Sequence, residues 1–192
     1  MSFVNFKIEG RAEVDRALRK LALEYPKEAS RALNATARRT RGRSLKATAA
    51  KIGIAQSNIK SRFMFFSANR NNLIAYAWIG TKAGLALASI RGASSSLTGV
   101  IKAGKLRVQT FKARMPNGHF GQFIRKENSK HKIRVDGQRT ELPIEEPRIR
   151  LGPIAQPILQ HVSRRQMIEY FPKEFRRLIA VTNRRLAQRK AR

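Results

Sequence analysis

The sequence contains no cysteine, so it can form neither a disulfide framework nor a thiolate metal site. This composition fits a reducing compartment without establishing one. Long hydrophobic runs are also missing, because the longest weakly polar run, Leu73–Ile79, is far too short to span a bilayer. Residues 1–9 resemble neither a signal peptide nor a membrane anchor. We therefore expect a protein without a membrane partner, soluble in the cytoplasm where it is made.

Acidic residues are scarce. The 192 residues include 41 Lys and Arg but only 12 Asp and Glu, which gives a formal net charge of +29. Residues 29–126 contain nineteen Lys and Arg and no acid at all. Because like charges repel, such a chain is destabilised in its compact state unless an acidic partner neutralises it. That partner is either nucleic acid or the acidic surface of another protein, and the charge alone does not choose between them.

Residues suited to catalysis or metal binding are few as well. The only histidines are His119, His131 and His161, and no two of them are spaced four residues apart. Glu145 and Glu146 are neighbours in an extended segment, so their side chains point to opposite faces. No serine lies in a Gly-x-Ser-x-Gly motif. We therefore expect that the protein is not an enzyme and binds neither a cofactor nor a metal.

One segment nearly matches a phosphate-binding P-loop. Residues 99–106 read Gly-Val-Ile-Lys-Ala-Gly-Lys-Leu, and Leu106 stands where a Ser or Thr would have to reach magnesium. A strand-like segment follows in place of the helix whose N-terminus a phosphate would need. We interpret the segment as a β-turn.

What the chain does contain is enough apolar residues, 42%, for a folded core, which argues against a disordered basic tail. The length favours a single domain over residues 1–192.

Helical periodicity predicts three helices. Apolar residues recur at helical spacing from Arg11 to Tyr25, and Pro26 is suited to open a second helix that continues towards Ala50. Gly53 marks its stop, and Ala55–Ser61 is a candidate short helix. A final basic helix is expected over residues 172–192, opened by Pro172.

Strand-like segments lie between these helices. Phe63–Ala68 and Leu73–Gly80 are rich in aromatic and branched residues and predict a β-hairpin or two neighbouring strands, with Leu85–Ile90 as a candidate third. Residues 91–99 are small and polar and predict a flexible loop. The later strand candidates are Val100–Lys102, Leu106–Thr110, Phe120–Lys126, Lys132–Val135 and, after a tight turn at Asp136-Gly137, Thr140–Ile144.

Four prolines, the first Pro143 and the last Pro157, are expected to limit regular structure until about Ile158. The resulting order is helices, then strands, then a helix. This segregated order predicts an α+β fold with N-terminal helices, a mainly antiparallel sheet and a basic C-terminal helix.

Two dense basic clusters are the main functional signal. Acids that normally intersperse an exposed helix face are absent around them, so we expect these residues to face a polyanion or an acidic protein. No zinc-finger, basic-zipper or RNA-recognition signature accompanies them, so base-specific readout is not expected. The residues of the two clusters are Arg38, Arg39, Arg41, Arg43, Arg184, Arg185, Arg189 and Lys190.

A motif in the second half of the chain resembles a known family. The first part of the motif is Met115, Gly118, His119, Gly121, Phe123 and Arg125, and the second part is Leu142, Pro143, Ile144 and Glu145. A Gly-Pro turn at Gly152-Pro153 follows, after Arg148-Ile-Arg150 interrupts the usual passage. This order resembles the minor tail protein Z family of long-tailed phages and prophages, also called tail completion proteins. The Ala- and Arg-rich segment Ala29–Arg43 and the basic C-terminal helix resemble the family as well.

The resemblance implies a structural virion protein at the head-proximal end of the tail, made in the host cytoplasm and acting late in assembly to make the tail competent for head joining. It implies a homo-oligomeric ring about the tail axis. The implied partners are the tail terminator, tube and tape-measure proteins, together with genome DNA contacted through phosphates and without base specificity.

The residues of the motif are expected to build the fold and its interfaces rather than to do chemistry. Leu142-Pro-Ile144 places a proline where a strand cannot donate a hydrogen bond, which predicts an edge strand suited to subunit contact. Arg125 is expected to cap or pair with Glu145 once the strands align.

A second interpretation needs only the composition: a free, sequence-nonspecific nucleic-acid-binding protein, ribosome- or nucleoid-associated. It predicts tight binding of naked DNA or RNA by the isolated monomer at physiological salt. The virion interpretation predicts weak binding that depends steeply on salt.

Overall fold

A computed structural model describes most of the chain. The described residues are 2–5, 21–22, 24–81, 84–91, 93–95, 100–114, 118, 120–125, 132–133, 139–141 and 144–191. The tight turn expected at Asp136-Gly137 lies outside these residues, as does most of the helix expected from Arg11 to Tyr25.

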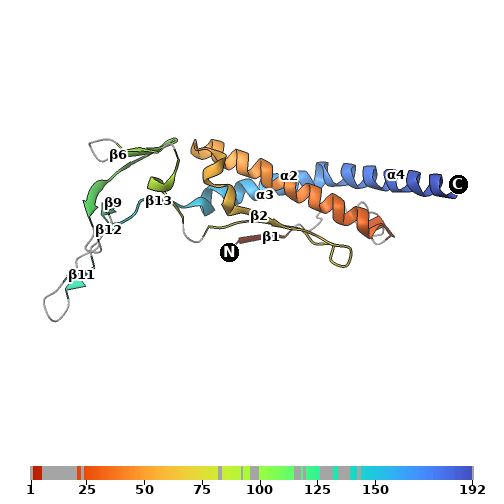
Figure 1. Cartoon of the computed structure of the whole chain (residues 1–192), viewed down its shortest axis with the longest axis horizontal. Helices are drawn as coiled ribbons and strands as arrows, with labels where there is room; N and C mark the ends of the chain where they lie inside the picture. The colour runs from red at the N-terminus through yellow and green to blue at the C-terminus, as the bar shows by residue number, and fades with distance from the viewer. Residues whose placement is uncertain are drawn as a thin grey trace.

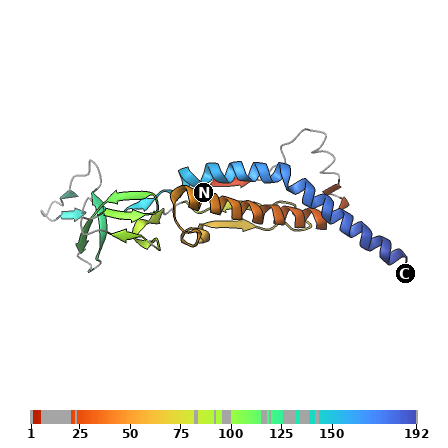
Figure 2. The ribbon, with the colours of Figure 1, turned by 90° about the horizontal axis from the view of Figure 1, so that it is seen from above.

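The predicted α+β class is confirmed, because long helices occur together with several small antiparallel sheets. The molecule is elongated (Figure 1). Helix α2 (Pro26–Ile52) lies beside the consecutive helices α3 (Leu151–Glu169) and α4 (Phe171–Lys190), which run in the opposite direction (Figure 2). The small strands of residues 94–145 form a separate group at the other end of the molecule (Figure 1).

Helix α2 begins and ends where the sequence predicts. Pro26 occupies its first turn, where the missing N–H has no helical partner to lose. Gly53 ends it in the left-handed conformation, with φ of 80°, and donates its N–H to the Ala49 carbonyl over 2.8 Å. The buried face is made mainly of small residues, so α3 and α4 can approach α2 closely.

The hairpin predicted between residues 63 and 80 is confirmed. Strands β2 (Phe63–Phe66) and β3 (Tyr76–Ile79) pair antiparallel, and β1 (Ser2–Asn5) adds to the other side of β3. Phe63 is fully buried and packs in one core cluster with Leu45 and Ile52 of α2. The sheet thus lies against the helices and leaves β2 at its edge.

The expected third strand over Leu85–Ile90 is only partly formed. Only Leu85–Ala86 (β4) is extended, and it pairs with β13 (Arg148–Ile149) rather than with the hairpin. Leu87–Ser89 form a 3-10 turn. The short helix expected near Ala55–Ser61 is two 3-10 turns, Gln56–Asn58 and Lys60–Arg62.

The remaining strands form three small antiparallel sheets. Their orders are β5-β6-β7, β12-β9-β8 and β10-β11. The bounds are β5 Ser94–Ser95, β6 Val100–Ala103, β7 Leu106–Gln109, β8 Phe111–Arg114, β9 Phe120–Arg125, β10 Lys132–Ile133, β11 Arg139–Glu141 and β12 Ile144–Glu145. Strand β5 falls in the described part of the segment that was expected to be a flexible loop.

The near-match to a P-loop is a β-turn, as predicted. Gly104 and Lys105 connect β6 to β7, and no helix follows them. The turn docks on the end of α2, because the Lys105 N–H donates to the Ile52 carbonyl over 3.0 Å. This contact joins the small sheets to the helical body.

The expectation that prolines prevent regular structure until Ile158 is wrong, and so is the expected Gly-Pro turn. Helix α3 begins at Leu151, and Gly152-Pro153 forms its first turn, where proline removes no helical hydrogen bond. Pro157 does lie inside the helix. We attribute the tolerance of Pro157 to tertiary packing, because Leu151, Ala155 and Leu159 are buried in the cluster that contains α2.

Candidate basic interface

The outer face of α2 carries exposed cations held against aromatic rings. The guanidinium carbon of Arg38 lies 5.8 Å from the Phe65 ring centroid, on the side of β2. The guanidinium carbon of Arg39 lies 4.4 Å from the Tyr170 ring centroid, at the α3–α4 junction. Cation–π contact orients a guanidinium while leaving its charge exposed. Together with exposed Arg43 and Lys46, these residues form a positively charged face, which we call the α2 outer face.

Arg41 belongs to a different environment from the other three arginines of its cluster. It is half-buried, and its Nε donates to the Phe63 carbonyl over 2.6 Å. Asn34, two turns earlier, makes a two-way contact with Ala68: its Nδ2 donates to the Ala68 carbonyl over 3.0 Å, and its Oδ1 accepts the Ala68 N–H over 2.7 Å. Arg41 thus satisfies a backbone group of β2, at the edge of its sheet, and Asn34 satisfies both backbone groups of Ala68, two residues beyond that strand. We therefore assign Arg41 a structural role.

Replacing Arg41 with alanine is expected to destabilise the protein by about 1–3 kcal/mol, because the buried Phe63 carbonyl loses a charged donor. The matched control is Arg43→Ala, two positions along, whose side chain is exposed. That variant should change stability by no more than about 0.5 kcal/mol. Urea denaturation of the two variants measures the difference, and equal effects would contradict the structural role of Arg41.

The second basic cluster lies at the end of α4, which extends beyond the start of α2 (Figure 2). Arg184, Arg185, Arg189 and Lys190 are all exposed. Near the start of α4, the face that packs on α2 is apolar and includes buried Phe171 and Phe175. That apolar face continues to Leu186, which is 50% exposed because α2 does not reach it.

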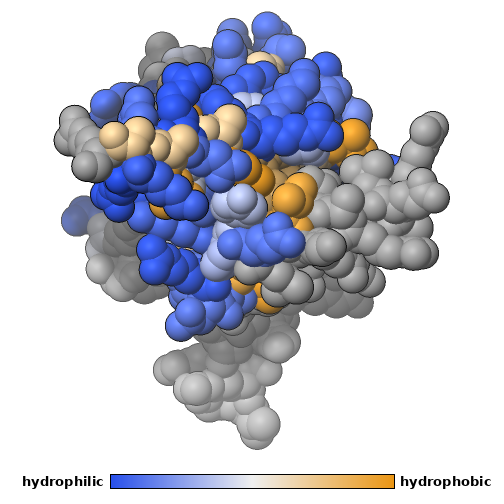
Figure 3. All heavy atoms as spheres, turned by 90° about the vertical axis from the view of Figure 1, so that its right-hand side faces the viewer, coloured by the Kyte–Doolittle hydropathy of each residue, from blue (hydrophilic) through white to orange (hydrophobic). Residues whose placement is uncertain are grey.

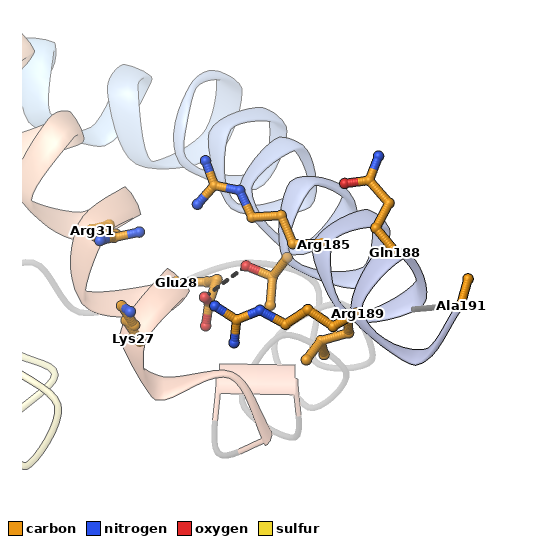
Figure 4. A pocket seen from close by; sticks show the side chains of 9 residues that line it. Lys27, Glu28, Arg31, Arg185, Gln188, Arg189 and Ala191 are labelled. Carbon is orange, nitrogen blue, oxygen red and sulfur yellow. Dashed lines mark hydrogen bonds between the residues drawn. The ribbon is translucent and has the colours of Figure 1, made fainter.

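A hollow of about 850 Å³ separates the start of α2 from the end of α4. Figure 4 shows Lys27, Glu28 and Arg31 entering from α2 and Arg185 and Arg189 from α4. Seen from this end of the molecule, hydrophilic side chains cover most of the described surface, with a few hydrophobic residues between them (Figure 3). The remaining lining residues are Thr182, Leu186, Gln188 and Ala191.

Glu28 connects the two walls of the hollow. Its carboxylate is buried and accepts a hydrogen bond from the Thr182 hydroxyl over 2.8 Å. Among the described residues, four cationic side chains and this one carboxylate line the hollow, so their positive charge is in excess. The hollow is therefore suited to an anionic group.

The acids of the helices mostly pair within their own helix. Glu174 and Arg177 lie 2.7 Å apart, and this hydrogen bond lowers the pKa of the Glu174 carboxyl below its usual value, against the opposing effect of burial. Arg165 pairs with Glu169 over 3.0 Å. No ion pair between residues that the structure describes includes any of the eight predicted basic residues. Their charge is thus not neutralised by described acids.

Several described residues of the family-like motif lie in the antiparallel sheet β12-β9-β8. Buried Phe123 lies opposite Phe111, with ring centroids 6.3 Å apart. The expected pairing of Arg125 with Glu145 is not observed. Arg125 lies opposite Ile144 in the strand register, and its guanidinium carbon is 5.8 Å from the Phe111 ring centroid.

Of the two glycines of the motif, Gly118 has a positive φ and Gly121 does not. Gly118 has φ of 83°, a conformation that favours glycine. Gly121 pairs with Ala113 in the β8–β9 ladder. Strand β12, with Ile144 and Glu145, is at the edge of its sheet, as predicted. The positions outside the described residues are Met115, His119, Leu142 and Pro143.

No family model matches this sequence, and no curated protein or solved structure matches it either. None of the helices that the structure describes has the length and apolar character needed to cross a membrane. Among the same described residues, no three His, Asp or Glu side chains gather where they could hold a metal ion.

Sequence reasoning missed half of the hollow. Lys27 and Arg31 lie about 150 residues before Arg185 and Arg189 in the chain, and no local pattern links them. The one local signal was Leu186, which continues the apolar face of α4 into a basic segment.

Proposed function

We propose that this protein is a structural virion protein at the head-proximal end of a long phage tail. In this proposal it completes the tail for head joining, as the family-like motif implies. It is a component of the assembly rather than an enzyme. It reaches the virion from the host cytoplasm, where it is made.

The observation that carries the proposal is the α2 outer face. Four exposed cations lie along it, and no acid occurs in the sequence from Ala29 to Lys126. A surface of one charge sign on an otherwise folded protein favours association with an anionic partner. Genome DNA entering the tail would supply phosphates, and acidic tail proteins would supply carboxylates.

The end of α4 suits a protein partner better than it suits DNA. Leu186 lies half-exposed among arginines, and interfaces between proteins combine an apolar centre with a polar rim. Candidate partners are the tail terminator, tube and tape-measure proteins. The edge strand β12 is available for contact between copies in a homo-oligomeric ring.

The test is complementation of a phage or prophage from which this gene has been deleted. The triple variant Arg38→Glu, Arg39→Glu, Arg43→Glu keeps Arg41 and therefore the edge of β2. Because like-charge contacts cost several kcal/mol at an interface, we expect infectious yield to fall by about a hundredfold or more. Tails should accumulate without joining heads, which electron microscopy would show.

The matched control reverses three exposed cations outside the candidate interface, Arg70, Lys102 and Arg107, which lowers the net charge by the same amount. Yield should stay within a few fold of the natural protein. Full yield from the α2 variant, or equal loss from both variants, would contradict the proposed contact surface. A virion that assembles normally without the gene would contradict the function itself.

The alternative, a free nucleic-acid-binding protein, is favoured by the same α2 outer face because every exposed side chain of α2 larger than alanine is cationic. The two functions differ in the salt dependence of DNA binding by the isolated protein. Tight binding at physiological salt supports the alternative. Weak binding that appears only at low salt supports the virion protein.

A further inference from the structure

Residue 42, in the middle of helix α2, is a glycine, and nothing in the described structure requires a glycine there. It is exposed, and a Cβ atom placed there would meet nothing within 4 Å. Its φ is not positive, unlike that of Gly53, Gly84, Gly104 and Gly118. Glycine in a helix interior destabilises the helix relative to alanine. A glycine that the fold does not require fits a place where another molecule approaches the backbone.

Cations surround this position. On a helix the residues three or four positions from residue 42 are 38, 39, 45 and 46. Leu45 is buried, and the other three are Arg38, Arg39 and Lys46. Arg43 is adjacent, and all four cations are exposed. Because Arg38 lies beside Phe65 and Arg39 beside Tyr170, their guanidinium groups are held on opposite flanks of α2. Gly42 thus leaves the backbone bare at its position among exposed cations, and we call this position the Gly42 notch.

A similar spacing occurs on the last helix. Arg38-Arg39-x-x-Gly42-x-x-x-Lys46 on α2 corresponds to Arg176-Arg177-x-x-Ala180-x-x-x-Arg184 on α4. Ala180 is exposed, as Gly42 is. In both helices two arginines and a later cation surround one small residue. The wider gap is on α2, because glycine has no side chain.

We infer that the Gly42 notch binds the phosphate backbone of double-stranded DNA and that the DNA approaches the protein most closely at Gly42. This inference rests on the proposed function and selects DNA, rather than an acidic protein, for the α2 outer face. Every exposed side chain of α2 larger than alanine is cationic, and a phosphodiester needs only donors and positive charge. The hollow at the end of α4 differs because it includes Leu186.

The experiment compares DNA binding by the purified full-length protein and two variants. Gly42→Leu fills the notch without changing the charge, and the control Ala50→Leu adds a similar side chain at an exposed position of the same helix. The probe is a 30-base-pair duplex of arbitrary sequence, followed by fluorescence anisotropy over a series of NaCl concentrations. Thermal unfolding of each variant is measured alongside.

Gly42→Leu is expected to weaken DNA binding by roughly tenfold, and to lower the salt slope by about one for the lost phosphate contact. Ala50→Leu should stay within about twofold of the natural protein. Since leucine is a better helix former than glycine, Gly42→Leu should unfold at the same or a higher temperature. Loss of binding together with retained stability supports the inference.

Three results would overturn it. The first is equal DNA affinity of Gly42→Leu and Ala50→Leu, and the second is no DNA binding by the natural protein at 50 mM NaCl. The third is that Gly42→Leu loses as much affinity for polyglutamate as it loses for DNA. The last would assign the notch to an acidic protein. Failure here remains distinguishable from failure of the proposed function. Normal virion assembly without the gene would contradict the proposed function, whereas DNA binding at the notch is measured separately with the purified protein.

Discussion

Replacing Gly104 with valine is expected to destabilise the protein by roughly 3 kcal/mol or more, which would be among the largest effects of any single substitution. Gly104 has φ of 61°, and a left-handed conformation costs an L-residue about 1–2 kcal/mol. A Cβ atom there would also overlap the Gly53 carbonyl and lie 2.8 Å from the Ile52 carbonyl oxygen. Backbone cannot move aside as a flexible side chain can, so the β6–β7 turn would separate from the end of α2.

Gly53 at the end of α2 is approached just as closely by the β6–β7 turn, which strengthens this prediction. A Cβ atom at Gly53 would lie 2.8 Å from the Lys105 Cγ and 2.9 Å from the Lys105 nitrogen. Losing the contact also breaks the hydrogen bond from Lys105 to Ile52, the link between the small sheets and the helical body. Gly118→Ala is the matched control, because Gly118 also has positive φ but open space around it. Urea denaturation should show that the control lowers the free energy of unfolding by only about 1–2 kcal/mol. An equally small loss for Gly104→Val would contradict the close contact between the β6–β7 turn and the end of α2.

Phe175→Ala is expected to cost about 3–5 kcal/mol. Phe175 is fully buried and stacks on Phe171, with ring centroids 5.6 Å apart. It packs against Ala29, Ala32 and Leu33 of α2, and these residues are too small or too fixed to fill the cavity that alanine would leave.

The consequence for the candidate interface is direct. If α4 loosens from α2, the hydrogen bond between Thr182 and Glu28 is lost and the hollow no longer has two walls. The control is Leu186→Ala on the same helix, half-exposed and expected to cost less than about 1 kcal/mol. Calorimetry of the two variants tests the comparison. Similar unfolding temperatures would mean that Phe175 does not hold α4 in place.

The elements that sequence patterns predicted well are those set by local chemistry. Pro26 and Gly53 bound α2 through their own backbone preferences, and Pro172 lies in the first turn of α4 for the same reason. The aromatic and branched residues of Phe63–Ala68 and Leu73–Gly80 predicted the pairing of β2 with β3. The edge position of β12 followed from a proline that cannot donate.

Helix α3 is the clearest failure of local reasoning. Its prolines predicted irregular structure, yet a helix forms because Leu151, Ala155 and Leu159 gain burial that outweighs the cost of Pro157. Arg41 is a second case. Its neighbours in the sequence are exposed arginines, and only the approach of β2 to α2 turns it into a donor for the Phe63 carbonyl.

By itself the sequence determined that this protein carries a large positive charge on a folded α+β chain, because charge and local backbone preference are properties of each residue and its near neighbours. Only the tertiary structure decided which cations face outward around Gly42, which one secures an edge strand, and which four meet across the hollow. The physical reason is that burial and long-range contact depend on segments that pack together from distant parts of the chain. Those contacts are favoured by packing energy and not by any local pattern.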